Sequence, residues 1–161
     1  MKLSVALAQI NPTVGDLNGN SALIMSSVQA AKAAGAHIIV FPEMIVTGYP
    51  VEDLALRPSF QDASIAAVEK IASQISGDIV AVVGYLDRGP QNTVAVIHEG
   101  KIKARYVKRH LPNYGVFDEF RNFTPGTSDL VVRIHGVDVA VAICEDIWHS
   151  MASIASRTPG L

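Results

Sequence analysis

Residues 78–108, DIVAVVGYLDRGPQNTVAVIHEGKIKARYVK, hold three apolar segments separated by turn residues. The first segment, residues 78–86, is a nearly continuous apolar run, which is typical of a strand covered on both faces. The next two segments, residues 92–98 and 101–108, flank the pair Glu99-Gly100, which favours a tight turn. The stretch therefore predicts one buried strand followed by a hairpin.

Two strand–helix units precede this stretch. Apolar runs predict buried strands at residues 3–10 and 37–41, and apolar residues at helical spacing predict amphipathic helices at 21–34 and 59–76. The inner faces of these helices are expected to carry Ile24, Val28, Ala31, Ile65, Val68, Ile71 and Ala72. The order of elements, strand–helix–strand–helix–strand followed by hairpins, predicts an α/β fold with a mixed sheet.

Turn and cap residues define the remaining elements. Asn20 is the expected N-cap of the first helix, and Gly35 is its expected stop. A single helical turn is expected at residues 53–57. Residues 110–126 form a long loop, and loops of this length are usually functional. Residues 129–143 read as a second hairpin that turns at His135-Gly136.

Composition restricts the class of protein. The chain of 161 residues fits one domain, and its 49% apolar and 17% charged residues exclude a disordered segment. The net charge of −2 offers no basic face for nucleic acid or an anionic membrane. No segment approaches the roughly 20 apolar residues of a membrane helix, and no secretory signal is evident. These features predict a soluble, cytoplasmic domain.

The sequence shows no pattern that is typical of a metal site or a nucleotide site. A single cysteine, Cys144, excludes an internal disulfide and any zinc site that needs cysteine pairs. The five histidines are scattered without a metal-binding pair, and neither a Walker A sequence nor a dinucleotide-binding glycine motif occurs. We therefore expect no metal site and no bound nucleotide in this chain.

Three reactive side chains follow predicted strands, namely Glu43, Lys108 and Cys144. The carboxyl ends of strands in an open α/β sheet form the usual ligand site, so these groups could converge. A lone cysteine is also commonly a small buried apolar residue. Opposite charges about 4 Å apart interact by about 4 kcal/mol at an effective dielectric near 20. Lys108 is thus expected to outweigh more distant carboxylates and to favour the Cys144 thiolate.

The segments around these residues carry a family resemblance. FPEM (41–44), YVKRHLP (106–112) and AICEDIW (142–148) resemble the nitrilase, or carbon–nitrogen hydrolase, superfamily, whose members use a Glu–Lys–Cys triad. FPEMIVTGYPVEDL (41–54) and KRHLPNYGVFDEFR (108–121) resemble, more narrowly, the N-terminal glutaminase domains of glutamine-dependent NAD+ synthetases. The resemblance runs from Leu3 to Trp148. It implies a four-layer αββα sandwich, of which this chain would hold the first half to two-thirds.

The resemblance also implies a reaction, the hydrolysis of the glutamine side-chain amide to glutamate and ammonia through a cysteine thioester. Cys144 would be the nucleophile, and Glu43 the general acid and base. Lys108, helped by the backbone N–H of Glu145, would stabilise the oxyanion. The expected substrate-binding residues are Tyr49, Tyr114, Glu119 and Glu145, with Glu145 suited to the substrate ammonium and Glu119 to orienting substrate and lysine.

The same resemblance sets expectations for domains and partners. Residues 1–148 would be a partial glutaminase domain, and residues 149–161 a divergent or truncated tail. Glutamine would be the substrate, and a C-terminal synthetase domain, which this sequence lacks, would use the ammonia to make NAD+ from its deamido precursor. ATP and Mg²⁺ would belong to that domain alone, so no cofactor is expected in this chain. The complete protein would form a homo-oligomer.

Other interpretations stay open at this point. The chain could be an incomplete domain that is catalytically inert or serves only in assembly. It could be a stand-alone amidase of the same superfamily, although TGYPVEDL (47–54) disfavours that reading. A papain-like pair of Cys144 with His110 or His149 lacks the local sequence signature of cysteine proteases.

Overall fold

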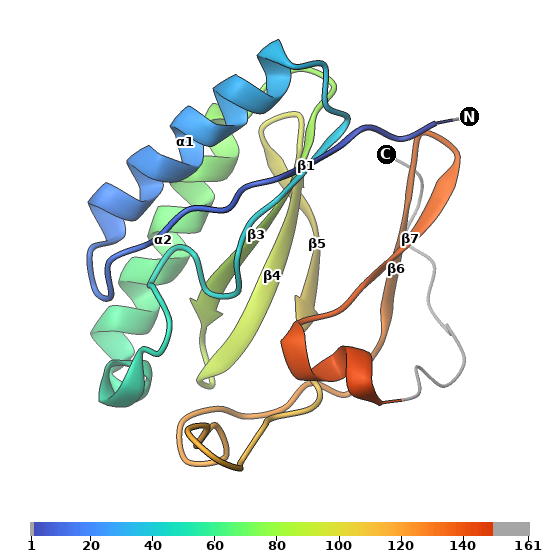
Figure 1. The fold of residues 1–161 in the computed structure, drawn as a ribbon. Helices are drawn as coiled ribbons and strands as arrows, with labels where there is room; N and C mark the ends of the chain where they lie inside the picture. Colours follow the sequence, from blue (N-terminus) through green and yellow to red (C-terminus); the bar gives the residue numbers. More distant parts are fainter. Residues whose placement is uncertain (1, 150–161) are drawn as a thin grey trace.

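A five-stranded mixed sheet forms the centre of the computed structural model, which describes residues 2–149 (Figure 1). Its strands lie in the order of the sequence, and the first three are parallel, whereas the last two are antiparallel to their neighbours. The strands are β1 (Val5–Leu7), β2 (Ile38–Val40), β3 (Val80–Asp87), β4 (Gln91–His98) and β5 (Lys101–Val107). The predicted mixed sheet is confirmed.

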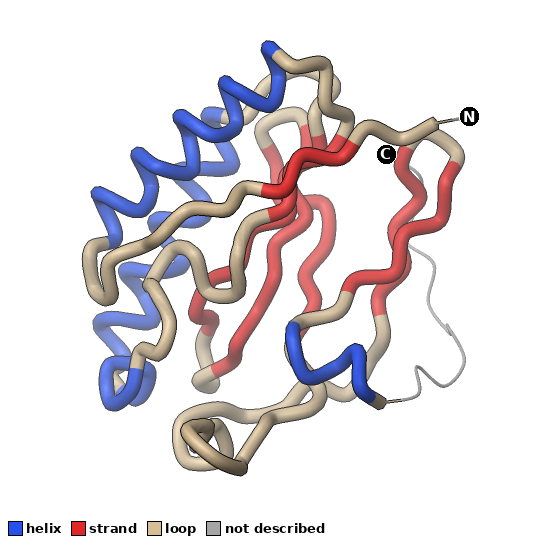
Figure 2. The backbone as a smooth tube through the Cα atoms, viewed as in Figure 1, coloured by secondary structure: helices blue, strands red, loops and turns tan. Residues whose placement is uncertain are grey.

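Helices cover one face of this sheet and a second, smaller sheet covers the other (Figures 1 and 2). The helical layer consists of α1 (Leu17–Ala33) and α2 (Pro58–Gln74). The second sheet is the hairpin of β6 (Leu130–Ile134) and β7 (Val137–Val141). Two 3₁₀ turns, η1 (Glu52–Leu56) and η2 (Cys144–Trp148), follow β2 and β7. Residues 2–149 thus form an α-layer and two β-layers.

The period of two along each strand explains this layering. In β4, Ala95 and Ile97 belong to the apolar cluster beneath the helices, while Val94 and Val96 belong to the cluster between the two sheets. Successive side chains of a strand point to opposite faces, so a strand that is apolar at every position can be buried on both. The sequence run around β4 therefore requires a cover on each side.

Two local predictions at the N-terminal end were wrong. Strand β1 is an edge strand of three residues, and Val5 and Leu7 are 50% and 70% exposed rather than buried. Helix α1 begins before the expected N-cap, because the Asp16 side chain accepts a hydrogen bond from Gly19 N at 2.8 Å. Asn20 is buried instead, and its side chain bonds to the backbone of neighbouring loops.

The predicted turns and helix faces agree with the structure. Glu99 and Gly100 both have positive φ, as do His135 and Gly136, so each pair makes the tight turn of its hairpin. The predicted inner faces are buried in both helices, with Ile65 partly so. No helix among residues 2–149 has the length and apolarity needed to span a bilayer. Apart from His149, the predicted tail lies outside the described residues.

Candidate active site

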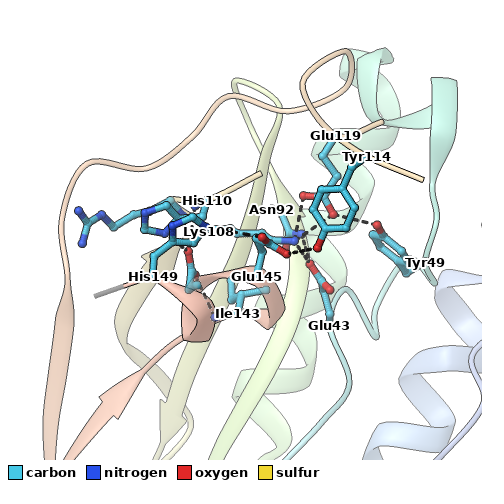
Figure 3. A network of polar contacts seen from close by, with 12 residues as sticks. Glu43, Tyr49, Asn92, Lys108, His110, Tyr114, Glu119, Ile143, Glu145 and His149 are labelled. Carbon is cyan, nitrogen blue, oxygen red and sulfur yellow. Dashed lines mark hydrogen bonds and ion pairs between the residues drawn. The ribbon is translucent and has the colours of Figure 1, made fainter. Parts of the chain in front are cut away.

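Glu43, Lys108 and Cys144 lie at the same edge of the molecule, where β2, β5 and β7 end. Lys108 directly follows β5, and Cys144 begins η2 beyond the end of β7. Figure 3 shows Glu43, Glu119 and Tyr49 gathered at the amine end of Lys108. The convergence expected from the strand ends is therefore present.

A sharp turn after β2 presents Glu43. The turn lies against β3, where Phe41 N donates to Val82 O and Val46 N to Gly84 O, both at 3.1 Å. A Cβ atom on Gly84 would lie only 2.5 Å from Met44 N, so this close approach requires glycine at position 84. Backbone packing therefore fixes the direction in which the Glu43 carboxylate leaves the sheet.

The Lys108 side chain is completely buried, which is rare for a lysine. Its ammonium lies 2.7 Å from Glu43 Oε1 and 2.9 Å from each carboxylate oxygen of Glu119. Burial alone lowers the pKa of Lys108, but the charges of Glu43 and Glu119 outweigh it and raise the pKa above its ordinary value. Lys108 is therefore a fixed positive charge at neutral pH.

Tyr49 completes this cluster from the turn before η1. Its hydroxyl donates to Glu119 Oε1 at 2.8 Å. Burial, together with the neighbouring Glu119 carboxylate, raises the pKa of Tyr49 far above its ordinary value, so the hydroxyl keeps its proton. Burial likewise raises the pKa of Glu119, and its contacts with Lys108 and Tyr49 oppose part of that effect. Glu119 thus bridges the lysine and the tyrosine.

Asn92 is a member of the cluster that the sequence did not indicate. The side-chain amide of Asn92 donates to Glu43 Oε1 at 2.7 Å, and the backbone carbonyl of Asn92 accepts from the backbone N–H of Lys108 at 2.9 Å. Asn92 is 1% exposed and occupies the second position of β4. The signal that could have identified it is an amide side chain two residues before the apolar run 94–97, on the strand next to the one that Lys108 follows.

Cys144 stands in an unusual backbone conformation. Its φ is +46°, which non-glycine residues seldom adopt, and it is exposed at the first position of η2. Strained residues of this kind cluster at functional sites, where the rest of the structure holds them in place. The conformation turns the chain out of β7, so the sulfur is accessible at the edge where Lys108 and Glu43 lie.

The electrostatic prediction for Cys144 was wrong in sign. Although the sulfur is accessible, partial desolvation raises the pKa of the thiol, the Glu43 carboxylate raises it further, and Lys108 opposes these effects without reversing them. Lys108 is already neutralised by two carboxylates, Glu43 and Glu119, so its positive charge does not govern the sulfur. The resting side chain is accordingly a thiol, and it needs a base before it can act as a nucleophile.

This arrangement predicts a pH profile for alkylation. Only the thiolate reacts with iodoacetamide, so the midpoint of the rate profile should lie above the pKa of an unperturbed cysteine. Replacing Glu43 with glutamine removes one negative charge and frees Lys108, and both effects favour the thiolate. The midpoint should therefore fall in Glu43→Gln and stay unchanged in Glu99→Gln, a distant exposed control. A midpoint that is unchanged or higher in Glu43→Gln contradicts this electrostatic account.

The four predicted substrate residues divide into two pairs. Tyr49 and Glu119 line a cavity of ≈ 180 Å³, whereas Tyr114 and Glu145 line a larger one of ≈ 720 Å³. The Tyr114 hydroxyl donates to Glu145 Oε2 at 2.7 Å. Glu145 is not among the principal charges acting on the thiol. Neither cavity is lined by Cys144, Lys108 or Glu43, and the larger one reaches the site through Glu145, the residue after the cysteine.

The two histidines near Cys144 make other contacts. His110 and His149 stack with ring centroids 3.9 Å apart, as Figure 3 shows, and each faces an acid. His110 Nδ1 lies 3.0 Å from Asp146 Oδ1, and His149 Nε2 lies 3.5 Å from Glu145 Oε1.

Within residues 2–149, no group of three or more His, Cys, Asp or Glu side chains could hold a metal ion.

The chain matches a family model described as carbon–nitrogen hydrolase over residues 4–161. It is 41% identical to a glutamine-dependent NAD(+) synthetase of Thermotoga maritima, over 99% of this chain and 28% of the relative. A solved glutamine-dependent NAD+ synthetase of Acinetobacter baumannii, in complex with ADP, is 40% identical with a TM-score of 0.83. That comparison covers 89% of this chain and 28% of the synthetase chain.

A further solved structure extends the likeness in fold. An amidase from Nesterenkonia sp. is 24% identical with a TM-score of 0.77, over 90% of this chain and 56% of the amidase. These likenesses confirm the predicted fold class, with the α-layer and two β-layers of residues 2–149 as part of it. The chain spans about 28% of the length of the synthetases that it matches.

Proposed function

Because the chain belongs to the carbon–nitrogen hydrolase family, we propose that it carries a glutamine amidohydrolase site with Cys144, Glu43 and Lys108 as its catalytic residues. One observation carries the proposal: a completely buried Lys108 ammonium, held by Glu43 and Glu119, beside the only cysteine. A fixed positive charge in a desolvated site is well suited to stabilise an oxyanion. Its neighbours supply a base and a nucleophile.

The first half of the reaction forms a thioester. Glu43 takes the thiol proton of Cys144, whose raised pKa makes this transfer necessary, and the sulfur attacks the amide carbon. The carbonyl oxygen becomes negatively charged, and Lys108 stabilises it with the backbone N–H of Glu145 as a second donor. The intermediate then collapses, the C–N bond breaks, and Glu43 gives its proton to the departing ammonia.

The second half hydrolyses the thioester. Glu43 accepts a proton from water, the resulting hydroxide attacks the acyl carbon, and Lys108 again stabilises the oxyanion. The C–S bond breaks, Cys144 recovers a proton through Glu43, and glutamate leaves. The sum is glutamine and water giving glutamate and ammonia, and each step uses a side chain of this chain.

Glutamine as substrate is supported by the relatives and by Glu145, which directly follows Cys144 and lines the larger cavity. Glu145 lines that cavity with its carboxylate bonded to Tyr114, and a carboxylate suits the α-ammonium of an amino acid. In this proposal Tyr114 orients Glu145, while Tyr49 and Glu119 hold Lys108 in place. The relatives at about 40% identity are glutamine-dependent NAD(+) synthetases, which supports glutamine over a simple amide.

The relatives extend the proposal beyond this chain. We place the ammonia produced here in NAD+ synthesis, with a synthetase domain as the partner that uses it and homo-oligomers as the working assembly, in the cytoplasm. ATP and Mg²⁺ would serve that domain; the A. baumannii relative was solved with ADP. Residues 1–148 would then be the glutaminase portion, and residues 149–161 its divergent end.

A substrate comparison tests the proposal. The purified protein should release ammonia from glutamine with a kcat/KM at least about 100-fold above that for propionamide, which lacks the charged amino-acid end. Glu145→Gln should lower kcat/KM for glutamine and leave the value for propionamide unchanged, because only glutamine contacts that carboxylate. Equal values for the two amides would favour a general amidase. No ammonia from either amide would favour an inert chain.

A further inference from the structure

Asp146, two residues after Cys144, is a buried acid that the proposed reaction does not use. It is 3% exposed, yet both of its carboxylate oxygens are fully engaged. Oδ1 accepts from the backbone N–H groups of Arg109 and His110, at 3.2 and 2.9 Å, and lies 3.0 Å from His110 Nδ1. Oδ2 accepts from the Tyr106 hydroxyl at 2.7 Å and from Ile143 N at 3.0 Å. One side chain therefore joins five donor groups.

The donors have a common property, since each lies within two residues of a proposed catalytic residue. Tyr106, Arg109 and His110 flank Lys108 on both sides, and Ile143 directly precedes Cys144. The lysine segment follows β5 of the large sheet, whereas the cysteine follows β7 of the small sheet. No ladder of backbone hydrogen bonds connects these two sheets among residues 2–149. Asp146 supplies a polar connection between them, and does so at the site itself.

The carboxylate is suited to this role because it stays ionised. Burial alone would raise its pKa, but the hydrogen bonds from Tyr106, Ile143 and His110 outweigh burial and lower the pKa below its ordinary value. An ionised carboxylate offers two oxygens that only accept, which matches five donors and no acceptor. Neither an amide nor a hydroxyl could satisfy the same set.

We propose that Asp146 is a positioning residue that fixes Cys144 relative to Lys108 by bonding the residue before the cysteine and the residues around the lysine. The inference rests on the proposed hydrolase function. Cys144 stands in a strained φ of +46°, and the Ile143–Asp146 hydrogen bond closes the turn that contains it. Without Asp146, the turn that holds Cys144 and the segment that holds Lys108 can separate. The sulfur and the ammonium then no longer reach the same carbonyl group of the substrate.

The test compares Asp146→Asn with Asp62→Asn in the purified protein. Asparagine keeps the shape but replaces one accepting oxygen with an NH₂ group. Asp62 is a matched control, since it is an exposed acid paired with Arg88 at 2.8 Å on the helical face. Displacement of a reacting group by about 1 Å costs about 100-fold in rate, so kcat for glutamine should fall about 100-fold in Asp146→Asn. KM should change less than about threefold, because no substrate contact is removed.

A second readout does not depend on turnover. Alkylation of Cys144 by iodoacetamide should show its pH midpoint shifted toward the value of a free cysteine in Asp146→Asn, because the thiol moves away from Glu43. A loss of stability alone leaves this midpoint unchanged at temperatures where the variant is folded. The Asp62→Asn control should match the wild type in kcat, KM and midpoint.

Tyr106→Phe keeps the test decisive if Asp146→Asn does not fold. It removes one hydroxyl donor and leaves the carboxylate in place, so kcat should fall about 10-fold with KM unchanged. A folded Asp146→Asn or Tyr106→Phe with wild-type kcat and alkylation midpoint overturns the positioning role. Full turnover in Cys144→Ala would instead overturn the proposed function, and the alkylation profiles of the other variants would still test Asp146.

Discussion

Replacing Cys144 with alanine is expected to lower the rate of ammonia release from glutamine by at least about 10⁴-fold, to the background of the assay. Alanine cannot form the thioester, and no other cysteine is available in the sequence. The change removes one exposed sulfur atom. Alanine has a Cβ atom as cysteine does, so the backbone strain at the positive φ of position 144 stays the same. The melting temperature should therefore stay within a few degrees of the wild type.

Mass spectrometry provides the matching observation. In the wild type, quenching during turnover should trap an adduct of the glutamyl group on the peptide that contains Cys144, and Cys144→Ala should show none. Cys144→Ser is the second control, because its hydroxyl is far less acidic and should support little turnover. A Cys144→Ala protein with more than a tenth of wild-type activity contradicts the assignment of the nucleophile.

Replacing Lys108 with methionine should lower the free energy of unfolding by about 3–5 kcal/mol, because it leaves two carboxylates near a buried site without their counter-ion. Glu119 is 3% exposed and Glu43 is half-buried, and both bond the ammonium directly. Burial already raises the pKa of Glu119, and loss of the lysine should raise it further. A carboxyl group with a raised folded-state pKa destabilises the fold once pH exceeds the unfolded-state value. Denaturant unfolding should therefore show a smaller loss in mildly acidic buffer than at neutral pH.

Lys103→Met is the matched control for this experiment. Lys103 lies in β5, the strand that precedes Lys108, and pairs at 3.4 Å with Glu99, an exposed residue of the turn before that strand. Lys103 is only half-buried and its partner faces solvent, so loss of the pair should cost less than about 1 kcal/mol. Adding Glu119→Gln to Lys108→Met should recover part of the stability, since one unpaired charge is removed. Equal losses at positions 103 and 108 would contradict the buried-cluster description. Ammonia release should be lost in Lys108→Met and retained in Lys103→Met.

Much of the fold could be predicted because it depends on neighbouring residues. Residues 94–97 are all apolar, and a strand of this kind must be covered on both faces. The Glu99-Gly100 and His135-Gly136 turns each contain a glycine, which adopts positive φ without a steric penalty. The misjudged elements, β1 and the start of α1, lie where burial depends on distant parts of the chain. Val5 has an apolar side chain that is typical of a core residue, and it is exposed because β1 is at the edge of the sheet.

The sequence indicated some residues of the candidate site but not all of them, and it predicted their arrangement only in part. Glu43, Lys108 and Cys144 were indicated by their places after strands and by the family resemblance. Asn92 and Asp146 were missed, because Asn92 stands in no motif and Asp146, although it lies in AICEDIW (142–148), has no role that the motif itself indicates. Their importance comes from what they touch, Glu43 in one case and the segment around Lys108 in the other.

The sequence alone determined the mixed sheet with its helical cover, the two hairpins and the three strand ends that carry reactive groups. These depend on periodicity and turn chemistry within a few consecutive residues. Only the tertiary structure decided the charge balance at Cys144. The thiol pKa depends on burial and on the sum of charges around the sulfur, and Lys108 meets Glu43 and Glu119 across 65 and 11 residues of chain. Glu43 follows β2 and Lys108 follows β5 of the same sheet, so these distances are set by strand pairing and loop packing between residues that are distant in sequence. The lysine that was expected to favour the thiolate therefore neutralises two carboxylates instead.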